Sequence, residues 1–273
     1  MKQILLALLT ATLFTSCCQS VYFVTDPVVT ANVKQRSDVN ISGGLNTGST
    51  TGGFHFNGAY ALTEKYFISA SGTHYSGTCQ SSNSSNGTSV KKNVNYSGNS
   101  LMGAFGYYKP LGNDFYFEPC AGLKFGTNFN SWKIDSTQNG NTVSTKENIQ
   151  FYHLKYFIQP GIAYNRKFFQ FGLGLRMGIL DYLPVRTGSL NSAPSISHEA
   201  PMFLFEPGLQ ICGGGQHVKL GIEFTGTLSD LGPVLIDPLF NNLLFSSTDR
   251  FALTFFLKVS LSKKTSEDYV PQK

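Results

Sequence analysis

The chain has little charge. Asp, Glu, Lys and Arg together make up 14% of its 273 residues, well below the roughly 25% of typical soluble domains. The formal net charge is only +5, and the Lys and Arg residues are scattered, which argues against nucleic acid as a partner. Beyond residue 18 no apolar run reaches the length of about 18 residues that a transmembrane helix needs. The sequence therefore excludes a helical membrane protein.

The chain also lacks clustered catalytic or metal-binding residues. Cys79, Cys120 and Cys212 lie far apart and form no C-x-x-C pair, so neither a disulfide framework nor a zinc site is predicted. The five His residues are dispersed, and no G-x-S-x-G motif is present. Gly172 and Gly174 lie in a predicted strand with no helix after it, which argues against a phosphate-binding loop. We expect no enzyme, no metal site and no cofactor.

Residues 1–17 have the pattern of a signal peptide. Lys2 supplies the positive charge, and residues 4–14 form an apolar stretch too short to cross a membrane. The end of this stretch, Leu13 to Cys17, resembles the lipobox of bacterial lipoproteins, in which the first residue after cleavage is a lipid-modified cysteine. The resemblance implies lipid attachment at Cys17. Attachment at Cys18 and ordinary secretory cleavage are the alternatives.

The strongest pattern in the chain is alternation with a period of two. Residues 152–179 form two alternating runs joined by a short polar turn at residues 165–167. In the second run the large apolar residues share one parity: Phe169, Phe171, Leu173, Leu175, Met177 and Ile179. The other parity holds small and polar residues: Gln170, Gly172, Gly174, Arg176 and Gly178. Successive side chains of a strand point to opposite faces, and about nine to eleven residues cross a bilayer as a tilted strand. The pattern predicts a membrane-spanning hairpin.

The same alternation predicts about ten strands within residues 37–261, with eight or twelve as alternatives. Short turns at 63–65, 109–114, 165–167 and 213–216 alternate with long polar loops at 76–98, 130–148, 181–200 and 229–248. Outer-membrane barrels have an even number of strands, short periplasmic turns and longer extracellular loops. The fold predicted is all-β, a closed antiparallel up-and-down transmembrane β-barrel. A soluble sandwich, which would bury its apolar faces against each other, is the alternative.

Both ends of such a barrel lie on the periplasmic side. We expect residues 18–36 to form a periplasmic linker near the membrane surface and residues 262–273 to form a polar periplasmic tail. Lipid on Cys17 would then lie in the inner leaflet of the outer membrane.

Charged residues on the polar parity are predicted to face the lumen, where opposite charges can pair. They are Glu118, Lys124, Lys155, Arg176, Glu206, Lys219, Glu223 and Lys258. A recurring motif places Pro119, Pro160 and Pro207 directly after Glu118, Gln159 and Glu206. Proline inside a strand marks a bulge or bend, so we interpret the motif as a shape device. A cluster of the three polar side chains inside the barrel is the alternative.

Taken together, residues 13–17, the strand at 54–62 with its turn at 63–65, the hairpin at 107–117 and the Glu-Pro-Gly strands resemble small lipid-anchored outer-membrane β-barrel proteins of Gram-negative bacteria. The resemblance implies a cell outer-membrane location, with outer-membrane lipid as a partner. It does not imply a function, because such barrels serve as pores, anchors, adhesins and a few enzymes. The polar residues 262–273 replace the final aromatic residue that many such barrels have.

We expect a non-enzymatic outer-membrane lipoprotein that is structural or weakly pore-forming, because a barrel of this size has a lumen mostly filled by side chains. The alternative is a barrel that binds a surface partner or small ligand through its extracellular loops. A periplasmic protein is a further candidate partner. An apolar segment in the last loop suggests the surface site, with Leu239, Phe240, Leu244 and Phe245 as candidates. A lipid-modifying enzyme would need a His with Ser or Asp at the lipid-facing rim, and no such grouping is present.

Overall fold

A computed structural model describes residues 23–24, 27–28, 30–48, 51–85, 88–112, 114–138, 141–187, 201–229, 248–249 and 251–261. These residues form strands and turns without a helix. Within them, no helix of the length and apolarity needed to cross a membrane occurs. The predicted all-β fold is confirmed, while the predicted signal peptide and the tail at 262–273 lie outside the described residues.

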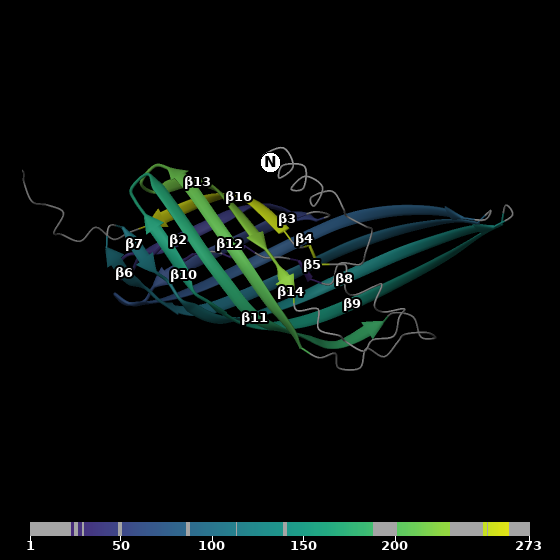
Figure 1. The fold of residues 1–273 in the computed structure, drawn as a ribbon, viewed down its shortest axis with the longest axis horizontal. Helices are drawn as coiled ribbons and strands as arrows, with labels where there is room; N and C mark the ends of the chain where they lie inside the picture. The colour runs from purple at the N-terminus through teal and green to yellow at the C-terminus, as the bar shows by residue number, and fades with distance from the viewer. Residues whose placement is uncertain are drawn as a thin grey trace, which may run out of the picture.

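The long strands of the described part carry most of the structure (Figure 1). They are β2 (Val39–Gly48), β3 (Gly52–Ala61), β4 (Tyr66–Ser85), β5 (Thr88–Tyr107), β8 (Cys120–Gln138), β9 (Asn141–Gln159), β11 (Phe169–Thr187), β12 (Met202–Gly214), β13 (Val218–Gly226) and β16 (Phe251–Leu261). The shorter strands are β1 (Phe23–Val24), β6 (Lys109–Gly112), β7 (Phe115–Phe117), β10 (Gly161–Asn165), β14 (Leu228–Ser229) and β15 (Thr248–Asp249).

Pairing between the long strands is antiparallel throughout. It runs from β12 through β13, β16, β2, β3, β4, β5, β8 and β9 to β11, and β11 pairs again with β12. The order of pairing thus returns to the strand from which it started. In the small β1–β15 pair, by contrast, the two strands are parallel.

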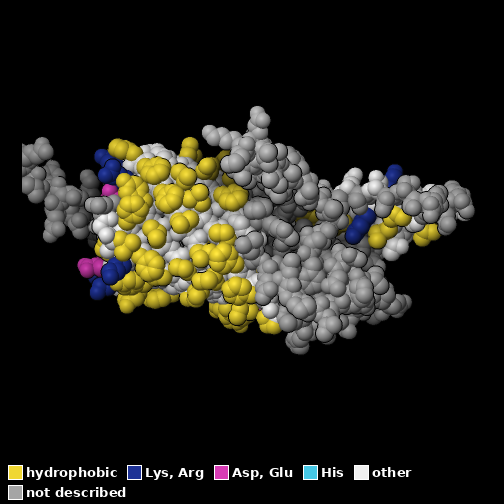
Figure 2. Space-filling view, in the orientation of Figure 1, with side chains coloured by type: hydrophobic (Ala, Val, Ile, Leu, Met, Phe, Trp, Pro, Cys, Tyr) yellow, Lys and Arg dark blue, Asp and Glu magenta, His cyan; other side chains and the backbone are white. Residues whose placement is uncertain are grey.

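Side chains alternate between the outside and an enclosed interior, as the sequence predicted. Leu45 and Leu220 are each 69% exposed, whereas Asn40 and Ser42 on the opposite parity are buried. Figure 2 shows hydrophobic side chains over the outside of the strands, with charged side chains gathered at the end where β6 and β7 lie. In a sandwich the apolar rows would be buried against each other. Their exposure rules out that alternative for the described residues.

Inward-facing aromatic rings lie directly opposite glycines on the neighbouring strand. The pairs that share a register position are Phe67 with Gly106, Tyr75 with Gly98, Phe157 with Gly122, His153 with Gly126, and Phe256 with Gly221. A Cβ added at any of these glycines would fall within 2.6 Å of the facing ring. The glycines therefore make room for rings that cover the exposed backbone, a known stabilising arrangement in sheets. The ring of Phe157, which interrupts the polar parity of its strand, has its place here.

The two ends of the strand array differ. At one end the strands are joined by short turns, such as residues 62–65 between β3 and β4. At the other end β4, β5, β8 and β9 project beyond the other strands (Figure 1). Strands β4 and β5 have 20 residues each, which corresponds to roughly 66 Å at about 3.3 Å per residue. A bilayer core is only about 30 Å thick.

This projection corrects the prediction of polar loops at 76–98 and 130–148. The described residues of these ranges continue β4, β5, β8 and β9 in register, from Ser76 paired with Ser97 up to Ser85 paired with Thr88, and from Asn130 paired with Ile149 up to Gln138 paired with Asn141. Residues 181–187, also expected in a loop, continue β11. The preference of a residue for strands depends strongly on context, so pairing with a neighbouring strand overrides the loop-like composition of these residues.

The prolines of the recurring motif do not all act alike. Pro119 separates β7 from β8, and Pro160 separates β9 from β10. These two breaks face each other, because Glu118 donates its backbone N–H to the Gly161 carbonyl at 2.8 Å. Pro207 lies inside β12 without interrupting it.

We predict that Gly106→Val destabilises the fold, because the new side chain would overlap the Phe67 ring. Overpacking of this kind typically costs about 1–3 kcal/mol. The matched control on the same strand is Gly103→Val, since a Cβ at Gly103 meets nothing within 4 Å. Urea unfolding in detergent micelles should show a lower midpoint for Gly106→Val alone. Equal midpoints would contradict the ring-on-glycine packing.

Candidate functional site

The interior holds a piece of the chain itself. We call Pro27, Val28 and residues 30–38 the inner segment. Most of it is buried, with Val28 at 1%, Thr30 at 3% and Val33 at 0% exposure. We expected residues 18–36 to form a linker near the membrane surface, and that expectation is wrong for the described part. Its side chains are small and include both apolar and polar ones. They therefore suit an interior in which glycines leave space and polar groups offer hydrogen bonds.

Glycines on the inward parity give the inner segment its space. A Cβ on Gly172 would lie 2.4 Å from the Thr30 hydroxyl oxygen, and a Cβ on Gly208 would lie 2.4 Å from the Val28 Cβ. A Cβ on Gly174 would meet Val28 Cγ1 at 2.6 Å. The alternation of glycine in β11 thus matches the side chains of the inner segment.

Hydrogen bonds attach the inner segment to several strands at once. The backbone N–H of Val28 donates to Thr225 Oγ1 at 3.2 Å, and that of Asn32 donates to Glu118 Oε2 at 3.0 Å. Arg176 Nη2 donates to the Pro27 carbonyl at 2.9 Å. Three further bonds join Thr30 and Asn32 to Gln210, and Asn165 to the Asn32 carbonyl.

At its C-terminal end the segment meets the start of the strands. Asn40 Nδ2 donates to the carbonyls of Ala31 and Asn32 at 2.8 and 2.7 Å. Ala31 and Val33 pack in a small apolar cluster with Ala59, Ala61, Phe67 and Tyr108. The inner segment is therefore part of the folded structure, with both polar and apolar contacts.

All eight charged residues predicted to face the lumen lie in the interior, each at 3% exposure or less. Three of them meet: Lys155 Nζ lies 2.7 Å from Glu206 Oε2, and Arg176 Nη1 lies 3.7 Å from the same oxygen. Arg176 also donates to Gln159 Oε1 at 3.1 Å and lies over the Phe157 ring. One carboxylate thus faces two cations.

Glu223 and Lys219 have partners outside this group of three. Glu223 accepts from Gln210 and Thr225, both at 3.2 Å, and Lys219 donates to the Gln216 carbonyl at 3.3 Å. Lys219 and Lys258 are directly opposite in register, as are Lys124 and Lys155. Of the polar residues before the three prolines, Gln159 and Glu206 meet through Arg176. Glu118 binds the inner segment instead.

Aromatic and charged side chains lie on the outside of the short-turn end. Tyr66 stacks on Phe105 with ring centroids 5.6 Å apart, and Tyr164 lies against Phe115 at 4.8 Å. The guanidinium of Arg166 lies over the Tyr164 ring and pairs with Asp114 at 3.1 Å. The hydrogen bond to Asp114 raises the pKa of Arg166. Such girdles are typical of membrane interfaces.

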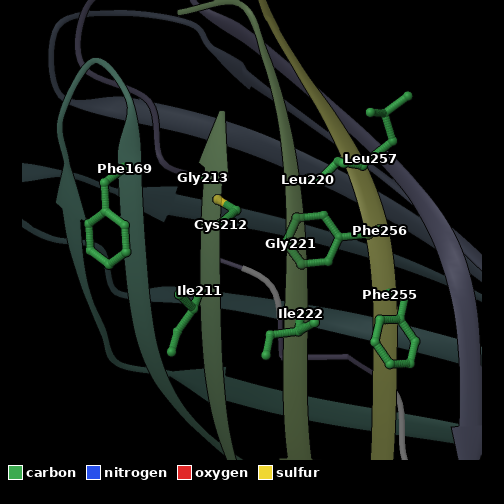
Figure 3. Close-up of a pocket in the computed structure, with 10 residues that line it drawn as sticks. All are labelled: Phe169, Ile211, Cys212, Gly213, Leu220, Gly221, Ile222, Phe255, Phe256 and Leu257. Carbon is green, nitrogen blue, oxygen red and sulfur yellow. The ribbon is translucent and has the colours of Figure 1, made fainter. Parts of the chain in front are cut away.

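A hollow on the outside of β11, β12, β13 and β16 has an apolar lining (Figure 3). Its walls include Phe169, Ile222 and Phe255. Cys212 also lines it, and the Cys212 thiol donates to the buried Gln170 Oε1 at 3.5 Å. No charged or amide side chain lines it, so it lacks a group that could orient or activate a substrate.

The remaining predicted sites are quickly placed. Cys17 and the loop candidates Leu239, Phe240, Leu244 and Phe245 lie outside the described residues. Cys120 and Cys212 are free thiols. Among the described residues, no group of three or more His, Cys, Asp or Glu is arranged to hold a metal ion.

The inner segment is the feature that sequence reasoning missed. Its signal was indirect: Gly172, Gly174 and Gly208 leave the inward face of two adjacent strands without side chains. A row of glycines inside a sheet often marks the close approach of another backbone. The glycine pattern alone did not identify the segment that approaches these strands.

Comparison with known proteins finds similar folds. The outer membrane protease OmpT from Escherichia coli aligns with a TM-score of 0.49 at 12% identity, over 82% of this chain and 96% of that one. The translocator domain of the autotransporter NalP from Neisseria meningitidis aligns with a TM-score of 0.47 at 10% identity, over 83% and 88%. The transport unit of the autotransporter AIDA-I from E. coli aligns with a TM-score of 0.34 at 10% identity, over 86% and 93%. No family model and no curated protein sequence matches the chain.

These similarities concern the fold. They agree with the all-β antiparallel architecture and its likeness to outer-membrane β-barrels. The prediction that the chain is not an enzyme is contradicted by the similarity to a protease, and we withdraw it. At 12% identity the similarity assigns no activity to this chain.

We predict that Glu206→Gln strongly destabilises the fold, because it leaves Lys155 and Arg176 as buried cations without their carboxylate. Breaking a buried pair in this way typically costs about 3–5 kcal/mol. The matched control is Asp114→Asn, which removes the exposed partner of Arg166 and should cause no measurable change in the free energy of unfolding. Urea unfolding in micelles compares the two. If Glu206→Gln unfolds at the midpoint of the unaltered protein, the interior charges do not depend on each other.

Proposed function

We propose that the chain is a closed ten-stranded transmembrane β-barrel of the Gram-negative outer membrane, with a lumen filled by its own inner segment. The order of pairing that returns to β12 supports closure. A strand array in lipid must close, because the backbone groups of an open edge would be left unpaired. The role that fits is structural: a stable unit that spans the membrane without a permanent aqueous path.

The observation that carries the proposal is the combination of exposed apolar rows and buried charge. Leu45, Leu101 and Leu220 on the outside are each more than 60% exposed, whereas Lys155, Arg176 and Glu206 inside are fully buried. In water this arrangement would be inverted. In a bilayer, lipid chains cover the apolar rows, so outer-membrane lipid is the partner that this surface fits.

The two unlike ends set the orientation. Barrels of this kind place short turns in the periplasm and longer connections outside the cell. On this basis the short-turn end, with Tyr66, Tyr164 and Arg166, faces the periplasm. The projecting parts of β4, β5, β8 and β9 extend from the cell surface. Binding of a surface partner there, or through residues 239–245, stays a prediction.

A filled lumen implies weak conductance. Barrels of about eight strands hold little more than their own side chains, while sixteen-stranded porins leave an aqueous channel. Here the buried residues of the inner segment lie inside, and Val28 and Thr30 lie directly on the glycines of β11 and β12. We therefore expect the barrel to conduct only when this segment is altered.

Planar-bilayer recording tests the filled lumen. The unaltered protein should give little or no stable current. Replacing residues 28–33 by alternating Gly and Ser keeps the chain length but removes the side chains that fill the lumen, so discrete current steps should appear. Val143→Ser on the projecting β9 is the control and should stay silent. A gel mobility that changes on boiling establishes that each variant is a folded barrel. Large stable currents through the unaltered protein would refute the proposal.

We propose in addition that Cys17 carries a lipid, from its place at the end of the lipobox-like residues 13–17. Cells fed radiolabelled palmitate should label the unaltered protein. Cys17→Ser should lose the label, because the modified atom is the thiol of the first mature residue. Cys18→Ser, one residue on, should keep it. Label that survives Cys17→Ser would point to Cys18 or exclude lipidation at residue 17.

A further inference from the structure

We infer that the inner segment threads the barrel, so that the chain enters the lumen at the cell surface and the residues before Phe23 lie outside the cell. This inference rests on the proposed membrane orientation. It reverses the side on which the even number of strands alone would place the N-terminus.

The contacts of the inner segment with β11 give its direction. Strand β11 begins at Phe169 beside the short turn and rises toward the projecting end. The Asn32 carbonyl bonds Asn165 in that turn, Thr30 lies at Gly172, Val28 at Gly174, and the Pro27 carbonyl bonds Arg176. As the residue number falls from 32 to 27, the level on the barrel wall rises without a reversal.

Both ends of the path agree with this direction. Below, the backbone of Ser37 and Asp38 pairs with Ala61 next to the short turn after β3. Above, Phe23 and Val24 pair with Thr248 and Asp249, which precede the start of β16. The far end of β16, Leu261, pairs with Val39 at the short-turn end. Phe23 and Val24 therefore lie at the opposite end of the barrel from Ser37 and Asp38, which end the inner segment.

The length of the segment is sufficient for the crossing. From Val24 to Asn32 there are eight residue steps, which span roughly 26 Å at about 3.3 Å per residue. The apolar band of an outer-membrane barrel is about 25 Å tall. An extended chain between these two residues covers the full height of the membrane.

The threading changes the leaflet in which a lipid anchor on Cys17 would lie. A lipid on Cys17 would lie only six residues before Phe23, too close to return through the filled lumen to the periplasmic side. It would insert into the outer leaflet, at the surface. The barrel would then display its own modified N-terminus instead of being held from the inside.

Epitope tags on intact cells test the threading. One tag is placed between Tyr22 and Phe23, a second replaces residues 139–140 at the tip of β8 and β9, and a third lies in the turn at residues 63–65. Antibody should bind the first and second tags on intact cells and the third only after permeabilisation. If the first tag behaves like the third, the inference is overturned.

The two control tags separate this inference from the proposed function. If the turn tag is accessible on intact cells and the β8–β9 tag is not, the proposed orientation is wrong, and the inference falls with it. If both controls behave as expected, the result for the first tag bears on the threading alone.

A disulfide tests whether the segment occupies the lumen in the membrane. A Cβ on Gly172 would lie 3.2 Å from the Thr30 Cβ, close to the roughly 3.5–4.5 Å of a disulfide. With Cys18, Cys79, Cys120 and Cys212 replaced by Ser, the pair Thr30→Cys and Gly172→Cys should form an internal crosslink on oxidation, seen as a mobility shift that reductant reverses. Thr30→Cys with Gly103→Cys, which faces outward, should not. Absence of the first crosslink in a folded barrel would contradict the inference.

Discussion

The burial of ionic and amide groups inside the strand array is the constraint on which the rest of the structure depends. An unpaired charge in such a place is strongly unfavourable, so the partners of these groups stabilise the fold, although Lys258 Nζ has no hydrogen-bond partner among the described residues. Lys155 and Arg176 share Glu206, while Glu118 and the Arg176 guanidinium also bond the backbone of the inner segment. The strands alone do not satisfy these groups. The inner segment supplies backbone donors and acceptors where a wider barrel would hold water.

The limited volume of the interior also explains the glycines on the inward faces of the strands. Those opposite Phe67, Phe157 and Phe256 accommodate inward rings, and those at 172, 174 and 208 accommodate Val28 and Thr30. At the level of Gly172, Thr30 takes the space that a wall side chain would fill and also donates to Gln210 on the neighbouring strand. Glycine on the wall therefore marks the levels at which something else fills the interior. Strand, ring and inner segment form one packed unit, which fits a barrier better than a channel.

The outer surface and the two ends of the strand array need fewer specific contacts than the interior. Outward Leu, Ile and Phe need only a hydrophobic solvent, and the aromatic and basic residues of the short-turn end suit the boundary between lipid and water. The projecting parts of β4, β5, β8 and β9 are mostly polar and pair in register along their backbones, although Val94 and Tyr96 are buried.

The sequence by itself determined the strands, their inward and outward faces and the burial of Glu118, Arg176 and Glu206, because a period of two in side-chain character translates directly into two faces. Only the tertiary structure decided that Val28 and residues 30–33 lie inside, and that the described residues of 76–98 and 130–148 are paired strands. Both depend on contacts between residues far apart in the chain: Asn32 with Glu118, Val28 with Gly208, Ser97 with Ser76 and Phe129. A local pattern cannot report such contacts, because polar residues of the same composition serve equally well as loop, strand or lumen filling.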